Sequence, residues 1–188
     1  MKKLLFAIIL SGITLVAQSQ TKDVSVEKSI NGIQIGVLGI WLHNETKLTR
    51  KLALRSEIGL DAGIFDGTLY TKTGYIFAPV ITLEPKWYYN LLKRASKSKN
   101  TSNNSGNFIS LNTSYHPDWF VISNYDNLSV PNQIAIVPTW GIRRNIGTHF
   151  NYETGIGLGY KYFFAESEYL NSQGHLALNL HLRIGYHF

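Results

Sequence analysis

The sequence predicts an all-β chain folded as an antiparallel, up-and-down barrel of about eight strands, on three observations. Apolar and polar residues alternate over long segments, and successive residues of a strand point to opposite faces of a sheet. These segments run to roughly 11–16 residues, longer than the ~5–6 residues usual for strands in soluble sheets. Aromatic residues gather near the ends of the apolar faces, which is typical of a barrel wall that crosses a membrane.

Residues 1–20 are expected to be a secretory signal peptide. Two lysines precede the apolar run 4–10, and residues 17–19 form an Ala-Gln-Ser cleavage site. The run is shorter than the ~20 residues that a spanning helix needs. We therefore expect a single barrel domain over 21–188, exported to the cell outer membrane.

The composition excludes several classes of function. Cysteine is absent, so disulfides, thiolate metal sites and a lipid-modified N-terminal cysteine are excluded. The net charge of +6 is modest and forms no stripe of the kind that binds nucleic acid.

The N-terminal segments alternate weakly. Segment 30–43 sets Ile33, Ile35 and Trp41 against Gln34, but the apolar stretch from Leu38 blurs the pattern. A strand must precede it, because the last strand is expected to end in the periplasm and bacterial single-chain barrels have even strand counts. The segment 22–29 is the only candidate for this first strand.

The three central segments each show one apolar face. These faces are Leu52, Leu54, Ile58, Leu60 and Ile64 in segment 52–64; Tyr75, Phe77, Pro79, Ile81, Leu83, Pro85, Trp87 and Tyr89 in segment 75–90; and Ile109, Leu111, Thr113, Tyr115, Pro117, Trp119 and Val121 in segment 108–122.

The three C-terminal segments alternate most strictly. Their apolar faces are Ile134, Ile136, Pro138, Trp140 and Ile142 in segment 133–143; Phe150, Tyr152, Ile156, Leu158, Tyr160, Tyr162 and Phe164 in segment 150–164; and every even-numbered residue from Leu176 to Phe188 in segment 175–188.

The opposite face decides between a membrane barrel and a secreted, soluble sandwich or lipocalin-like barrel. Alternation alone does not say which face is inside, but glycines such as Gly155, Gly157 and Gly159 suit a crowded interior better than a solvated surface. Charges of both signs share that face, so we expect a filled, polar lumen. The predicted lumen charge network is Arg55, Glu57, Asp61, Glu84, Lys86, His116, Asp118, Arg143, Glu153, Lys161, His181 and Arg183, with Tyr88, Phe108, Phe120 and Phe163 also facing inward.

The connections differ in length. Residues 44–51 and 144–149 read as short periplasmic turns, whereas 65–74, 123–132 and 165–174 read as longer external loops. The segment 91–107 is long and basic although its place puts it on the periplasmic side. Its cations, which could contact anionic lipid head groups or only keep the turn in water, are Lys93, Arg94, Lys97 and Lys99.

The signal peptide, the alternating strands and the closing "LRIGYHF" resemble the small outer-membrane β-barrel proteins of Gram-negative bacteria. The stretches "APVITLEPKWYYNLLKR" and "PTWGIRRNIGTHFNYETGIGLGY" look like outer-membrane barrel proteins of Bacteroidetes. This resemblance implies that Phe188, with Tyr186 upstream, is the signal read by the barrel-assembly machinery. It specifies fold and location, not activity.

The sequence favours a non-enzymatic role without cofactors. His116 and Asp118 could form a general base on one strand, but no nucleophile is placed beside them. His175, His181 and His187 share a face yet span ~40 Å of strand, too far for one metal ion. The expected protein is a monomer, structural, adhesive or binding through its external loops and basic periplasmic turn, with lipid as its partner. The alternatives are a lipid- or peptide-modifying enzyme and a narrow pore.

Overall fold

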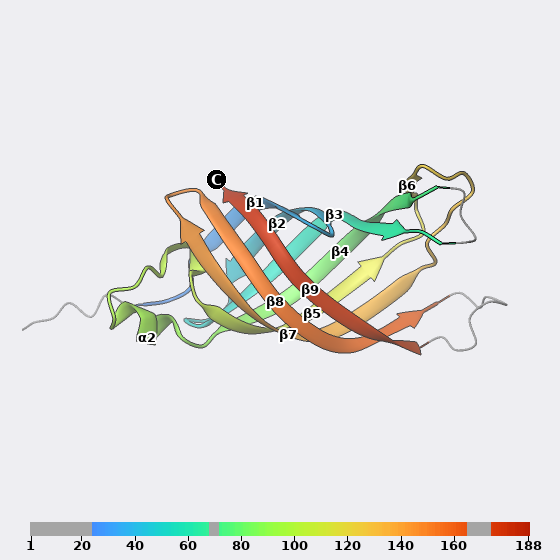
Figure 1. The fold of residues 1–188 in the computed structure, drawn as a ribbon. Coiled ribbons are helices and arrows are strands. Elements are labelled where there is room, and N and C mark those ends of the chain that lie inside the picture. The colour runs from blue at the N-terminus through green and yellow to red at the C-terminus, as the bar shows by residue number, and fades with distance from the viewer. Residues whose placement is uncertain (1–23, 68–71, 165–173) are drawn as a thin grey trace, which may run out of the picture.

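A computed structural model of the chain describes residues 24–67, 72–164 and 174–188, and these form an all-β fold with one antiparallel sheet. Eight strands close into a ring in which each pairs with its neighbours along the chain and the last pairs with the first (Figure 1). The predicted signal peptide lies outside the described residues. The strands are β1 Ser29–Gly36, β2 Gly39–Lys47, β3 Leu52–Phe65, β4 Gly74–Tyr88, β5 Asn107–His116, β7 Gln133–Ile146, β8 Phe150–Phe163 and β9 Gly174–His187, with the two-residue β6, Ile122–Ser123, attached to β4.

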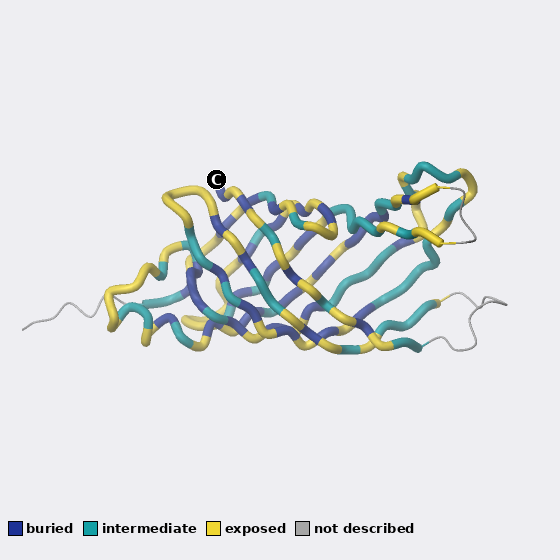
Figure 2. Tube along the Cα trace, viewed as in Figure 1, coloured by how far each residue is buried: buried dark blue, intermediate teal, exposed yellow. Residues whose placement is uncertain are grey.

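The ring turns its apolar face outward, as the sequence analysis predicted. Along β9, Leu176, Leu178, Leu180 and Leu182 are each more than half exposed, whereas Ala177 and His181 between them are buried. Figure 2 shows a similar alternation along β1, β2 and β7, whereas parts of β3, β5 and β8 are mostly of intermediate exposure. The polar side chains therefore fill the enclosed middle of the ring.

Two interior glycines make room for aromatic rings. A Cβ atom on Gly141 would lie 2.3 Å from Cζ of Phe108, and one on Gly59 would lie 2.5 Å from Cδ1 of Trp41. Both rings are buried. Glycine on the inward face thus allows large side chains from neighbouring strands to fit inside a narrow ring.

The first two strands differ from the prediction. Segment 30–43 is not one strand but a hairpin that turns at Val37 and Leu38, and no strand forms over residues 24–28. The turn residues are apolar, which hid the turn in the hydrophobic pattern, while Gly39 adopts a φ of 145° that favours glycine. The ring still has eight strands because β1 and β2 divide the segment between them.

The predicted strand 108–122 is also too long. β5 ends at His116, directly before Pro117, whose ring removes a backbone donor. Asp118 and Phe120 are therefore exposed in the following loop instead of facing the interior. Phe120 lines an apolar groove against the outer surface of β3 and β4.

We call the end of the ring where β9 terminates the closed end, and the opposite end, with the connections after β1, β3, β5 and β8, the loop end. At the closed end, segment 91–107 forms a short helix α2, Leu91–Ala95, and a 3₁₀ turn η1, Ser102–Asn104. Leu91 packs with Val26, Ala53, Tyr88 and Phe108 in a buried cluster. None of the helices in the described part of the chain has the length and hydrophobicity to span a membrane.

Candidate functional site: the ion-paired interior and the cavity beside it

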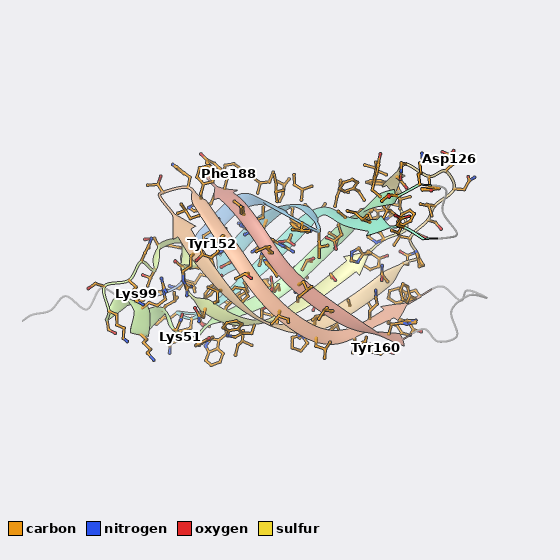
Figure 3. The ribbon with its side chains drawn as sticks, in the orientation of Figure 1. Lys51, Lys99, Asp126, Tyr152, Tyr160 and Phe188 are labelled. Carbon is orange, nitrogen blue, oxygen red and sulfur yellow. The ribbon has the colours of Figure 1, made fainter. Side chains whose placement is uncertain are left out.

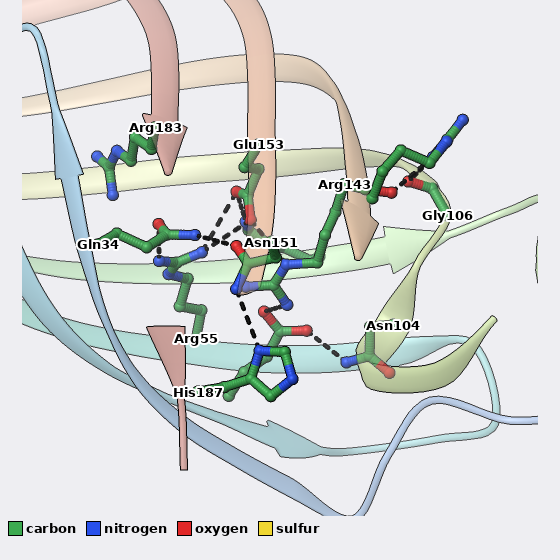
Figure 4. A network of polar contacts seen from close by, with 12 residues as sticks. Gln34, Arg55, Asn104, Gly106, Arg143, Asn151, Glu153, Arg183 and His187 are labelled. Carbon is green, nitrogen blue, oxygen red and sulfur yellow. Dashed lines mark hydrogen bonds and ion pairs between the residues drawn. The ribbon is translucent and has the colours of Figure 1, made fainter. Parts of the chain in front are cut away.

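A network of buried charged and polar side chains lies in the half of the interior nearest the closed end. Figure 3 shows the side chains of the described residues on the ribbon, and Figure 4 shows members of this network from close by. The strands bring these residues together because each places polar residues inward at every second position. Four acids and four bases balance each other in formal charge. They are Glu45 from β2, Arg55 and Glu57 from β3, Glu84 and Lys86 from β4, Arg143 from β7, Glu153 from β8 and Arg183 from β9.

Glu153 is the centre of the network. Its carboxylate lies 3.1 Å from Nη1 of Arg55 and 2.9 Å from Nε of Arg143, and it also pairs with Lys86. Nε2 of His181 lies 3.0 Å from its Oε1. All these side chains are at least 99% removed from solvent. A buried carboxylate is tolerated here because three cations surround it.

Glu45 forms a second centre, closer to the closed end. Arg143 Nη1 and the Tyr88 hydroxyl each donate to its carboxylate at 2.9 Å. The amide of Asn104, in η1, donates to the same group, and the Asn104 carbonyl oxygen accepts from the backbone N–H of Glu27 at 2.7 Å. Segment 91–107 is thus joined to the interior by a fully buried side chain.

The remaining acids have their own partners. Arg183 Nη1 donates to both oxygens of Glu57 at 2.9 and 2.8 Å, and Arg55 Nε donates to Glu57 at 2.9 Å. Ser110 Oγ donates to Glu84 at 2.6 Å, and Lys86 lies 3.4 Å from Glu84. Every carboxylate in the network is therefore neutralised by at least one cation, which is the arrangement of a structural core.

The network contains most of the predicted lumen residues but not all. Asp61, His116 and Lys161 lie farther toward the loop end, around a separate cavity. Asp118, exposed in the loop after β5, was wrongly placed in the lumen. The predicted residues that do lie in the network are Arg55, Glu57, Glu84, Lys86, Arg143, Glu153, His181 and Arg183.

The sequence analysis missed two members of the network. Glu45 was assigned to a turn, although it lies two positions after His43 and shares the inward face of β2 with it. Gln34 was seen on the polar face but left out, yet its amide donates to Asn151 at 3.1 Å and its carbonyl oxygen accepts from Arg55. Continuing the alternation of β2 through Glu45 would have found the first.

The predicted pair of His116 with Asp118 does not form. Instead, His116 Nε2 lies 2.8 Å from Oδ2 of Asp61, whose Oδ1 accepts from Trp41 Nε1 at 2.8 Å. His116 Nδ1 is buried without a hydrogen-bond partner. This geometry resembles an oriented base, and no hydroxyl of the described residues is bonded to Nδ1.

Trp41, Asp61 and His116 line a cavity of about 310 Å³ on the loop-end side of the network. Thr82, Asn112, Ser114, Gln133 and Asn179 contribute further polar groups to its wall. The cavity can therefore hold a small polar group as well as water.

The remaining predicted residues lie at the closed end. Tyr186 and Phe188 stack edge to face with centroids 5.8 Å apart, and the Phe188 side chain is exposed. Lys93, Lys97 and Lys99 are exposed, whereas Arg94 donates to the carbonyl oxygen of Asn100.

The described residues contain no cluster of three or more His, Cys, Asp or Glu side chains that could hold a metal ion. Comparison of the chain with models of protein families, with curated proteins and with solved structures finds no match.

Proposed function

We propose that the chain is an integral β-barrel protein of the outer membrane of a Gram-negative bacterium, a non-enzymatic and monomeric anchor that presents the loops of its loop end outside the cell. The observation that carries this proposal is the inverted distribution of side chains. Ion pairs occupy the interior, while Leu, Ile and aromatic residues cover the outer surface. A soluble protein of this size does not expose an apolar surface that encircles it.

The dimensions of the apolar surface support a membrane location. On the outward face at β8, Tyr152 and Tyr162 are ten positions apart, which corresponds to about 34 Å of strand, and exposed Phe150 and Phe164 lie just beyond them. At a tilt of about 40°, this corresponds to about 26 Å along the axis, close to the ~25 Å apolar band of outer-membrane barrels. Trp140 and Tyr89 are hydrogen-bonded at 2.9 Å and lie at the edge of the apolar surface nearest the closed end. Amphipathic rings of this kind favour the lipid–water boundary.

The filled interior favours an anchor over a pore. Eight strands enclose a space that side chains can fill, and the network, together with the cluster around Tyr88 and Phe108, fills the half nearest the closed end. An enzyme using His116 and Asp118 is not supported, because these two residues are separated.

The test is fluorescence quenching in lipid vesicles. Variants that keep only Trp87 or only Trp140 are refolded into vesicles whose acyl chains carry bromine near the head group or near the chain end. We expect strong quenching by the shallow bromines and weaker quenching by the deep ones. A mature chain that stays monodisperse without detergent, and whose tryptophans are not quenched in vesicles, would refute the proposal.

Planar-bilayer recordings test the anchor against the pore. We expect no steady conductance from the inserted protein, because buried, ion-paired side chains occupy the interior near the closed end. Steady single-channel current steps would refute the anchor proposal in favour of a pore.

A further inference from the structure

The wall of the ring has an opening on one side. The hairpin of β1 and β2 is short: it turns at Val37 and Leu38, whereas the strands on either side of it, β9 and β3, have 14 residues each. β9 pairs with β1 only from Arg183 to His187, so that residues 176–182 have no strand partner on that side among the described residues. β3 likewise pairs with β2 only as far as Asp61. In Figure 1 the hairpin ends between β3 and β9, which continue past it toward the loop end.

The size of this opening, which we call the notch, follows from strand geometry. β9 and β3 are three strand spacings apart along the ring, and at about 4.8 Å each this gives about 14 Å between their backbones. Val37, Ile64 and Leu176 border it and are each more than 70% exposed. Unpaired strand edges are costly in hydrocarbon, so the notch is a place where polar groups or water must reach the membrane-facing wall.

The notch connects the interior to the outer surface. A cavity of about 300 Å³ lies there, and its wall includes both inward-facing Asn179 and outward-facing Leu180 of β9. Leu38, Trp41 and Arg183 line this cavity and also the interior cavity of about 310 Å³. Inward- and outward-facing side chains of one strand can line the same space only where the wall is interrupted.

The lining is basic on the inside and apolar on the outside. Lys161 lines the interior cavity and forms no ion pair with any described residue; its ammonium group lies 5.3 Å from the centre of the Phe163 ring. Arg183 stacks over Trp41 at 3.7 Å and uses only Nη1 for Glu57, which leaves Nε and Nη2 without a bond to described residues. The one acid in the wall, Asp61, is already bonded to Trp41 and His116.

We propose that the notch is a lateral binding site for a single-chain anionic amphiphile, a long-chain carboxylate, that enters from the surrounding membrane. The carboxylate occupies the interior cavity beside Lys161 and Arg183, and the alkyl chain leaves through the notch along Leu180, Leu182 and Val37. Two cationic side chains without a full set of partners select an anionic head over a neutral or cationic one. The proposal depends on the membrane location proposed above.

The test uses Trp41, which lines both cavities, as the reporter. A variant with Trp87→Phe, Trp119→Phe and Trp140→Phe keeps Trp41 alone and is folded in detergent micelles. It is titrated with a fatty acid brominated near its carboxylate and, separately, with the matching brominated alcohol. We expect saturable quenching by the acid and about tenfold weaker binding of the alcohol. Lys161→Gln should weaken binding of the acid by about tenfold, the effect of losing one charge-assisted contact, whereas Lys72→Gln, at the same end, should not.

A second pair of variants tests the route. Leu38→Trp fills the notch from the tip of the hairpin and should abolish binding. Because this variant adds a tryptophan, its binding is measured by the displacement of a fluorescent fatty acid. Leu48→Trp, in a turn at the closed end, should leave it unchanged.

The outcomes separate this inference from the membrane proposal. Equal and non-saturable quenching by acid and alcohol, with Trp87 and Trp140 still quenched by lipid, overturns the binding site and leaves the membrane barrel standing. Absence of lipid quenching of Trp87 and Trp140 removes the membrane proposal and this inference with it.

Discussion

Replacing Glu153 with glutamine tests whether charge balance stabilises the interior. The substitution keeps the shape of the side chain but removes one negative charge that Arg55, Lys86 and Arg143 share. Three acids, Glu45, Glu57 and Glu84, would then face four bases. Lys86 would keep Glu84 as its partner, and Arg143 would keep Glu45. Arg55 would have only Glu57, whose charge Arg183 already balances.

Removing one partner of a buried ion pair costs about 3–5 kcal/mol. We expect Glu153→Gln to lower the free energy of unfolding by an amount in this range, since the group is completely buried. The double variant Glu153→Gln with Arg55→Met removes the surplus cation and leaves three intact pairs, Glu57–Arg183, Glu84–Lys86 and Glu45–Arg143. We expect the second change to restore about half of the loss, a coupling of the size seen between groups in contact.

Urea unfolding of the detergent-refolded protein, followed by tryptophan fluorescence, measures these changes. Asp126→Asn, an exposed acid in a loop, serves as the control and should shift the free energy by less than about 0.5 kcal/mol. The reasoning is wrong if Glu153→Gln shifts it no more than the control does, or if Arg55→Met deepens the loss instead of reversing it.

Three further variants test other parts of the molecule. Asn104→Ala should release segment 91–107, cost about 1–3 kcal/mol and speed tryptic cleavage after Lys97 and Lys99; unchanged cleavage would contradict this. Gly141→Ala places a Cβ 2.3 Å from the Phe108 ring and should cost about 1–3 kcal/mol in urea unfolding, a loss that Phe108→Leu should reduce. Phe188→Ala should lower the amount of protein in outer-membrane fractions while leaving the urea midpoint of the refolded protein unchanged; normal amounts would argue against an assembly signal at Phe188.

The strands from β3 onward, apart from the end of β5 and the short β6, and the orientation of their faces could be predicted because alternation at period two is a strong local signal. Charges and glycines on one face also indicated an interior, and Arg55, Glu84 and Glu153 are buried in the structure. The hairpin at Val37 was missed because its turn is apolar, and hydrophobic pattern alone does not separate a turn from a strand there. Gly36 and Gly39, which flank it, were the available signal.

Which residues contact one another could not be predicted. His116 could be assigned to the inward face, but its partner depends on the stagger between strands around the ring, which one sequence does not specify. Asp61 is 55 positions away from it, whereas Asp118 is only two. The nearer residue was chosen, and the end of β5 before Pro117 removed it from the interior.

The seam between β1 and β9 has a consequence for the order of assembly. It joins the two ends of the chain through five residue pairs, from Gly32 with His187 to Gly36 with Arg183, whereas β8 and β9 share thirteen. Pairing β1 with β9 closes a loop of about 150 residues, and the entropic cost of closing it is offset by only a few contacts. We therefore expect strands that are neighbours in the sequence to pair first, and β1 to pair with β9 last. The pairing of β1 with β9 is then also the first to separate when the protein unfolds.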